Sequence, residues 1–241
     1  MKRKNLFVRL VEANLESAGI ILDRLTPLRG IVIATIIVSL ILDPFVQANV
    51  TTTGAIVYAI SFFIARQWFL MASFGAQGIA SWLKRKYGVA QGGDWYEFIT
   101  ALFFYHRSYS YSLLLNKTHF IGLEALLPYE PYLLVIGWLL ISLGLVVNTW
   151  SYLLIGREAY YYLDMYYGRF FKPFVAEGPY KYLNNPMYSV GQLPAYGAAL
   201  MAGSGVGLVL AVLNQIACYI FYHRYERPHI EAVLAKQAQP A

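Results

Sequence analysis

The segment Tyr132–Ile155 reads YLLVIGWLLISLGLVVNTWSYLLI, and it decides the class of this protein. It contains no Asp, Glu, Lys or Arg. A helix needs about 20 mainly apolar residues to cross the hydrocarbon core of a bilayer, and this segment is longer than that. The segment therefore predicts a membrane-spanning α-helix.

The composition of the whole chain agrees with a membrane protein. Of its 241 residues, 58% are hydrophobic and only 13% are charged, whereas a soluble domain carries about 25% charged residues. Apolar runs close to spanning length recur on both sides of Tyr132–Ile155. In chain order they are Arg29–Val46, which we expect to break near Asp43-Pro44, then Gly54–Leu83, Trp95–Leu115 and Met187–Tyr222.

The last of these runs, Met187–Tyr222, is too long for one crossing. The sequence GSGVG at Gly203–Gly207 divides it into two halves, and glycine permits the backbone conformations of a tight turn. No predicted strand precedes these glycines, so a nucleotide-binding loop is disfavoured. We predict an all-α fold, a polytopic integral membrane helical bundle of about six transmembrane segments that ends in a helical hairpin.

The N-terminal residues 1–28 show a different pattern. Their charges recur along the segment, which is unlike a signal peptide. Five apolar residues fall on one helical face: Leu6, Phe7, Leu10, Val11 and Leu15. This predicts an amphipathic helix, either lying on the membrane surface or packed on the bundle. We divide the chain into this helix at 1–28, membrane helices at 29–131 and a core at 132–241.

Basic residues cluster at one predicted face of the bundle. They are Lys2, Arg3, Lys4 and Arg9 before the first span, Lys84, Arg85 and Lys86 after the second, Arg157, Arg169, Lys172 and Lys181 after the fourth, and Arg224 and Arg227 after the hairpin. The positive-inside rule places this face, with both termini, in the cytoplasm. The net charge of +6 is explained by this topology and by anionic headgroups, so we expect no nucleic acid partner.

The single cysteine, Cys218, excludes an intrachain disulfide and a cysteine-based metal cluster. It stands in an apolar run, which is typical of a packing residue rather than a nucleophile. We expect no metal cofactor.

Two polar clusters interrupt the apolar C-terminal part. The first is GPYKYLNNPMYSVGQ at Gly178–Gln192, and the second is YHRYERPHIEAVLAK at Tyr222–Lys236. Asn185-Pro186 should start a helix, because proline disfavours helix before it and suits a first turn. If the hairpin folds back, both clusters meet at the cytoplasmic face and form one site, open to a polar cofactor from the cytosol and a lipid from the bilayer.

These clusters resemble a known family. Gly178-Pro179-Tyr180, Asn185-Pro186-Met187-Tyr188 and Gly191, followed by ERPH, are similar to the signature of membrane-embedded phosphatidylethanolamine N-methyltransferases. These enzymes are phospholipid methyltransferases of the isoprenylcysteine carboxyl methyltransferase-like superfamily, and the fungal first-step type is the most similar. The segment YYYLDMYYG at 160–168 also resembles the family, and the resemblance covers about residues 132–236.

The resemblance implies transfer of a methyl group from S-adenosylmethionine to phosphatidylethanolamine, giving the monomethyl lipid. The cofactor-binding residues that it implies are Gly178, Tyr180, Asn185, Pro186, Tyr188, Gly191 and Glu226. One departure concerns the second acid of the family's carboxylate pair, whose place is taken by Arg227; Glu231 is the candidate replacement.

Methyl transfer needs the amine, methyl and sulfur held in line, and a group that takes the amine proton. Glu226, His229 and Glu231 are the catalytic candidates, and Arg224 and Arg227 are the candidates for the lipid phosphate. Each also has a structural interpretation: the tyrosines as interfacial aromatics, Asn185 as a helix cap and Glu226 as part of a solvated charge cluster.

Other functions remain open at this point. A carboxyl methyltransferase of the isoprenylcysteine type and an NADPH-dependent sterol-type reductase share the superfamily fold, and a transporter or membrane scaffold is the non-enzymatic alternative. The sequence leaves the number of methylation steps and the oligomeric state undetermined.

Overall fold

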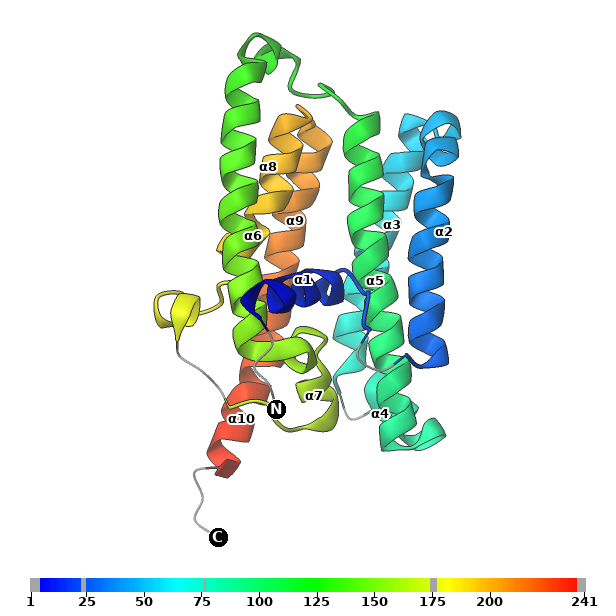
Figure 1. Cartoon of the computed structure of the whole chain (residues 1–241), viewed down its shortest axis with the longest axis vertical. Coiled ribbons are helices and arrows are strands. Elements are labelled where there is room, and N and C mark those ends of the chain that lie inside the picture. Colours follow the sequence, from blue (N-terminus) through cyan, green and yellow to red (C-terminus); the bar gives the residue numbers. More distant parts are fainter. Residues whose placement is uncertain (1–4, 23–24, 76, 174–176, 238–241) are drawn as a thin grey trace.

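The computed structural model describes residues 5–22, 25–75, 77–173 and 177–237 (Figure 1). The basic residues Lys2, Arg3 and Lys4 and parts of segments 1–28 and 132–241 lie outside this description. The α-helices are α1 Leu6–Ser17, α2 Pro27–Asn49, α3 Thr52–Ser73, α4 Ile79–Tyr87, α5 Val89–Lys117, α6 Glu130–Tyr160, α7 Leu163–Tyr167, α8 Leu193–Met201, α9 Gly205–Phe221 and α10 Arg227–Gln237. Short helical turns join them: η1 Glu124–Tyr129, η2 Gly178–Lys181, η3 Val190–Gln192 and the π-helical η4 Tyr222–Glu226.

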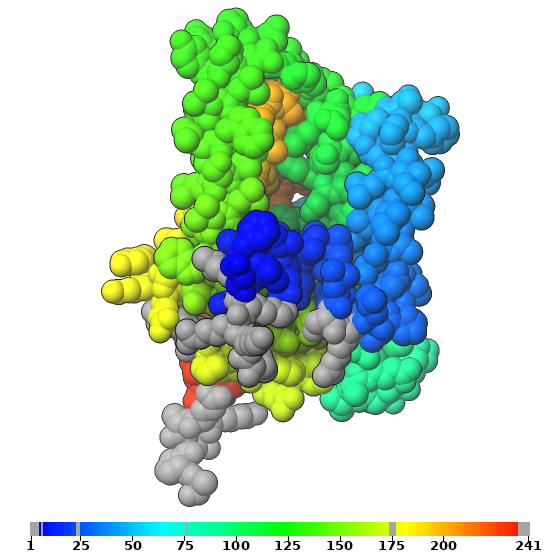
Figure 2. Space-filling view, in the orientation of Figure 1, coloured from blue at the N-terminus to red at the C-terminus, as the bar shows by residue number. Residues whose placement is uncertain are grey.

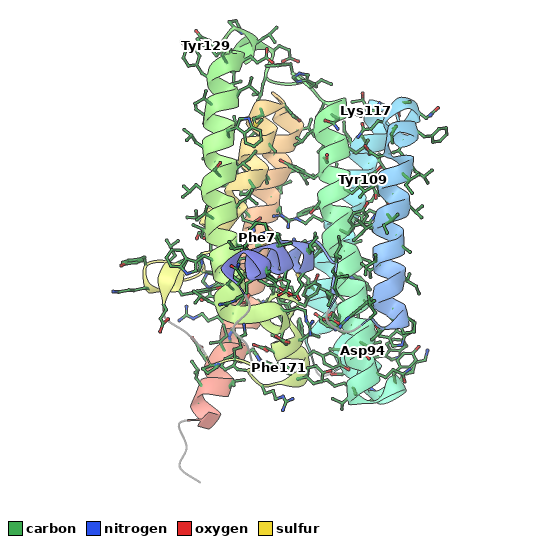
Figure 3. The ribbon with its side chains drawn as sticks, in the orientation of Figure 1. Phe7, Asp94, Tyr109, Lys117, Tyr129 and Phe171 are labelled. Atoms are coloured by element: carbon green, nitrogen blue, oxygen red, sulfur yellow. The ribbon has the colours of Figure 1, made fainter. Side chains whose placement is uncertain are left out.

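The long helices run side by side in an upright bundle (Figure 1). α2, α3 and α5 form one half, and α6 packs on the hairpin of α8 and α9 to form the other. α3 and α5 also contact α9, which joins the halves. Figure 3 shows Lys117 and Tyr129 towards one end of the bundle and Asp94 and Phe171 towards the other, where α4, α7 and α10 lie. The predicted all-α membrane bundle is confirmed.

Four helical segments among the described residues are long and apolar enough to cross a membrane. They are Pro27–Asn49, Thr52–Ser73, Glu124–Tyr167 and Gly205–Ala235. Large apolar side chains such as Trp138 and Leu139 on α6 are 59% and 66% exposed, as expected for a surface that faces lipid. The predicted crossings at α5 and α8 fall outside this set, because the polar stretch HRSYSYS at 106–112 lowers the hydropathy of α5 and because α8 has only nine residues.

Two predicted boundaries are wrong. α2 continues through Pro44 to Asn49 instead of breaking; neighbouring helices and local adjustment allow proline inside membrane helices. The run Gly54–Leu83 is two helices, α3 and α4. A Cβ at Gly78 would lie 2.5 Å from the Ser73 carbonyl oxygen, so the tight reversal between them needs a glycine there.

The C-terminal hairpin turns at the predicted glycines. Gly203 has φ +59°, and the Ser204 side chain caps α9 by accepting a hydrogen bond from the Gly207 amide at 2.9 Å. α8 approaches α6 closely, since a Cβ at Gly197 would lie 2.5 Å from the Gly137 carbonyl oxygen. Small residues allow such close helix packing in a membrane, where the hydrophobic effect does not drive helices together.

α1 lies across the long helices and not along them (Figure 1). It packs on α6, where the Tyr152 hydroxyl donates to the Glu16 carboxylate and the Tyr161 hydroxyl donates to the Glu16 carbonyl oxygen at 2.5 Å. Phe7 and Val11 remain 70% and 41% exposed. The helix is therefore anchored to the bundle while part of its apolar face stays uncovered.

Candidate functional site

A cavity of about 640 Å³ lies between α3, α5, α6 and the α8–α9 hairpin. Figure 2 shows the molecule hollowed between α5 and α6, with the hairpin behind. Its wall combines apolar residues with tyrosines, arginines and one buried carboxylate oxygen, that of Glu226. Ligand sites usually have this character and a volume of roughly 300–1,000 Å³.

The asparagine-proline motif forms one wall of the cavity. The Asn185 side chain accepts a hydrogen bond from the Tyr188 amide at 3.1 Å, and the Ser189 hydroxyl donates to the Asn185 carbonyl oxygen at 2.8 Å. The helix that we expected to begin at Pro186 begins instead at Leu193, after a turn and η3. The Asn185 cap closes this turn locally, and Pro194 provides the first-turn proline of α8.

Glu226 lies at the end of the π-helical turn η4, where the chain passes from α9 to α10. Its Oε2 atom is buried and has no hydrogen-bond partner among the described residues. The carboxylate interacts electrostatically with the hydroxyl groups of four tyrosines: Tyr162, Tyr180, Tyr188 and Tyr222. Burial, followed by the Glu226 charge, raises the pKa of Tyr180 well above its usual value, so its hydroxyl stays protonated.

Tyr162 also reaches the cavity, although it is not among the predicted site residues. It has the left-handed backbone conformation φ +58°, ψ +23°, which is strained for a residue other than glycine and is often found at functional sites. Its hydroxyl lies 3.1 Å from that of Tyr188. The segment resemblance at 160–168 was the available signal, but nothing in it distinguished this tyrosine from its neighbours.

The structure brings most of the predicted site residues to the cavity. Those that line it are Tyr180, Asn185, Tyr188, Gly191, Glu226, Arg227 and Glu231. Gly178 and Pro186 instead support the wall, and Gly178 packs against the Trp150 ring with φ +55°. Arg224 and His229 lie at a separate depression of about 320 Å³ beside α4.

Arg227 and Glu231 form an exposed ion pair, with the Arg227 Nε atom 2.8 Å from the Glu231 Oε1 atom. Each therefore has its charge largely satisfied by the other. This leaves Glu226 as the predicted acid whose buried oxygen is unpaired.

Polar residues from the other half of the bundle complete the cavity. Arg66 on α3 and Arg107 on α5 line it, and Gln192 on η3 and Asn214 on α9 line it from the hairpin half. Gln192 Oε1 accepts hydrogen bonds from Arg107 at 3.2 Å and from Asn214 at 2.9 Å. Arg66 stands inside a predicted span, and an ionisable residue there is itself a signal of function.

No metal-ligand cluster of three or more His, Cys, Asp or Glu side chains occurs in the described part of the chain.

Residues 132–237 match the family model for phospholipid methyltransferases. The chain is 31% identical over 97 residues to the phosphatidylethanolamine N-methyltransferase of Pyricularia oryzae. This alignment covers 40% of this chain and 10% of that protein. It is 33% identical over 101 residues to the enzyme of the same name from Scheffersomyces stipitis, and 32% over 108 residues to that from Candida albicans. These alignments cover 42% and 44% of this chain and 12% of each relative.

The chain thus spans about a tenth of the length of the curated relatives that it matches. No solved structure shows a significant match. The matched segment contains α6, the asparagine-proline motif, the hairpin and Glu226. Residues 132–237 are therefore similar to phospholipid methyltransferases, and this matched segment provides the asparagine-proline wall of the cavity and Glu226.

Proposed function

We propose that this protein transfers a methyl group from S-adenosylmethionine to the amine of phosphatidylethanolamine and releases monomethyl-phosphatidylethanolamine. The observation that carries the proposal is the buried, unpaired Oε2 atom of Glu226, which faces a tyrosine-lined cavity in the family-matched segment. A buried carboxylate oxygen without a partner is unfavourable, so it is retained where a ligand satisfies it. The names of the fungal relatives favour the phospholipid amine over a prenylated carboxylate as the acceptor.

The residues present fit S-adenosylmethionine, which when bound supplies a methyl group on a positively charged sulfur. Aromatic rings of Tyr180, Tyr188 and Tyr222 border the cavity and attract a cation through their π-faces. The Glu226 carboxylate adds a negative charge beside them. The cavity volume of about 640 Å³ also suits a ligand of this size.

The amine of phosphatidylethanolamine is protonated in water and must lose that proton before its nitrogen can attack. Glu226 Oε2 accepts the proton in this proposal, because Glu231 is paired with Arg227 and His229 lies at the other depression. The N–C bond then forms as the S–C bond breaks, and the electron pair of that bond stays on sulfur. The walls of the cavity hold the two reactants in line and exclude water.

The orientation is also proposed. Glu226 lies near the end of the bundle where α4 carries Lys84, Arg85 and Lys86 and where α10 begins at Arg227, and we place this end in the cytoplasm with both termini. The soluble methyl donor then enters from the cytosol, and the lipid enters from the bilayer.

The test is a reconstituted reaction. Purified protein in nanodiscs containing phosphatidylethanolamine receives S-adenosylmethionine with a deuterated methyl group, and the lipids are analysed by mass spectrometry. We expect labelled monomethyl-phosphatidylethanolamine, with the Glu226→Gln variant at least a hundredfold slower, in the range typical of a lost general base. Glu231→Gln is the matched control and should retain most activity. Donor binding without a labelled lipid would indicate another acceptor, and no donor binding would overturn the proposal.

A further inference from the structure

Two arginines, the buried Arg66 on α3 and the half-buried Arg107 on α5, line the cavity from outside the family-matched segment. Arg66 is only 4% exposed, and its Nε and Nη1 atoms are buried without a hydrogen-bond partner among the described residues. Its guanidinium carbon lies 5.4 Å from the centre of the Phe104 ring, so one face of the group is held by a cation–π contact. The Nε and Nη1 groups at its edge are therefore left for a ligand, while Cys218 also interacts with the side chain.

Arg107 provides a second positive charge at the same wall. One of its nitrogens donates to Gln192 Oε1 at 3.2 Å, which fixes the side chain against the motif. The two guanidinium groups repel each other electrostatically. No carboxylate oxygen lies within 4.0 Å of either group in the described part of the chain.

This arrangement is unfavourable without a ligand. A charge that is buried without a counter-charge destabilises the folded protein, and the repulsion by a second positive charge adds to that cost. An anionic group between the arginines would relieve both penalties, and guanidinium groups bind phosphate and carboxylate oxygens through paired hydrogen bonds.

The rest of the cavity has the opposite sign. Arg66 interacts electrostatically with the hydroxyls of Tyr162 and Tyr188, and the same hydroxyls interact with the Glu226 carboxylate. A tyrosine pair thus lies between a negative and a positive wall. Zwitterions complement such a cavity, and phosphatidylethanolamine and the amino-acid part of S-adenosylmethionine are both zwitterions.

We propose that Arg66 and Arg107 form a binding subsite for the anionic end of a zwitterionic ligand, a phosphodiester or a carboxylate, opposite Glu226. The inference rests on the proposed function for the identity of the ligands. It assigns a role to residues 29–131, which carry no family motif.

Binding measurements without turnover test the subsite. The first variant, Arg66→Met, removes the charge and keeps much of the side-chain length. The second, Arg66→Lys, keeps the charge but lacks the paired N–H groups of a guanidinium. The matched control is Arg85→Met on the exposed face of α4. The probes are S-adenosylhomocysteine and 5′-methylthioadenosine, which lacks the carboxylate, by calorimetry, and phosphatidylglycerol and phosphatidylethanolamine by native mass spectrometry.

The two sources of the anion give different results. If the subsite holds the lipid phosphate, Arg66→Met weakens retention of both lipids at least tenfold and leaves the Kd of S-adenosylhomocysteine unchanged. If the subsite holds the carboxylate, Arg66→Met raises the Kd of S-adenosylhomocysteine at least tenfold and leaves the Kd of 5′-methylthioadenosine unchanged. Arg66→Lys should be intermediate and Arg85→Met unchanged in both cases.

Stability provides a second readout that does not need a ligand. Removal of an unpaired buried charge should raise the Tm of the ligand-free protein, so Arg66→Met should unfold at a higher temperature than the unmodified chain in detergent. The proposed subsite is overturned if Arg66→Met folds and its affinity for each of the four probes differs from that of the unmodified chain by no more than twofold. Arginine-dependent binding of phosphatidylglycerol in a protein that methylates no lipid would support the subsite and reject the proposed function.

Discussion

The hydroxyl groups of Tyr162 and Tyr188 lie 3.1 Å apart, although 26 positions separate them in the sequence. The pair connects the segment after α6 to the asparagine-proline motif at the cavity wall. Tyr162 reaches this position through a left-handed backbone conformation that follows the kink at Gly156, where φ is +83°.

We expect Tyr188→Phe to reduce methyl transfer about tenfold or more, because its hydroxyl interacts with both Glu226 and Arg66. The matched control is Tyr182→Phe, which removes the same group from a side chain that is 79% exposed in the same motif. The methyl-transfer rates of the two variants are measured with the labelled donor and compared. Equal rates would contradict a role for the Tyr188 hydroxyl.

Gly178→Ala should destabilise the protein. Gly178 has φ +55°, and a Cβ there would lie 2.8 Å from the Trp150 ring, so both backbone strain of about 1 kcal/mol and a steric clash oppose the substitution. Gly168→Ala is the control, since Gly168 has φ +70° but open space around its Cβ position. Thermal unfolding in detergent should show a clearly larger loss for Gly178→Ala; a loss no greater than the control would argue against the clash.

Glu97→Gln should cost about 3–5 kcal/mol in the free energy of unfolding. The Glu97 carboxylate is buried between Arg29, at 2.7 Å, and Arg157, at 3.3 Å, so loss of its charge leaves two arginines without this counter-charge. The exposed pair provides the comparison: Glu231→Gln breaks only the contact with Arg227, and such surface pairs contribute roughly 0.2–1 kcal/mol. Unfolding by SDS in mixed micelles measures the free energy of unfolding of both variants. Similar decreases for the two would contradict a stabilising role for the buried Arg29–Glu97–Arg157 contacts.

Single cysteines in a Cys218→Ser background test the orientation. We expect Lys86→Cys and Lys181→Cys to react with a membrane-impermeant thiol reagent only after the cytoplasmic face is opened, because basic residues mark that face. Glu124→Cys, at the opposite end of the bundle, should show the reverse pattern. Labelling of Lys86→Cys and Lys181→Cys from opposite sides would reject the topology.

The main product should be the monomethyl lipid. Arg227, at the cavity margin, stands where the family's small enzymes have a second acid, and a guanidinium there disfavours a cationic headgroup that becomes bulkier with each methyl group. Its exposed pair with Glu231 limits the effect. Arg227→Glu should therefore shift the product towards di- and trimethylated lipid by only a few fold. Rapid conversion of added monomethyl lipid to phosphatidylcholine by the unmodified chain would contradict this prediction.

The sequence by itself determined the class of the protein and the local parts of the site. Bilayer thickness sets the length of a spanning helix, so runs such as Tyr132–Ile155 identify membrane helices directly. Glycine acts on the backbone next to it, so the hairpin turn at Gly203 was visible in the sequence. The helix predicted to start at Asn185-Pro186 begins only at Leu193, because the Asn185 side chain closes a local turn first.

Only the tertiary structure decided which side chains meet in the cavity. In a bilayer, lipid is as apolar as the protein interior, so apolar periodicity does not separate a lipid-facing side from a packed one. The motif identified Glu226 in the sequence, but nothing there connected it to Arg66; the two reach one cavity because α3 packs against α9. The burial of their charged atoms follows from that packing, and it gives the site its two opposite walls.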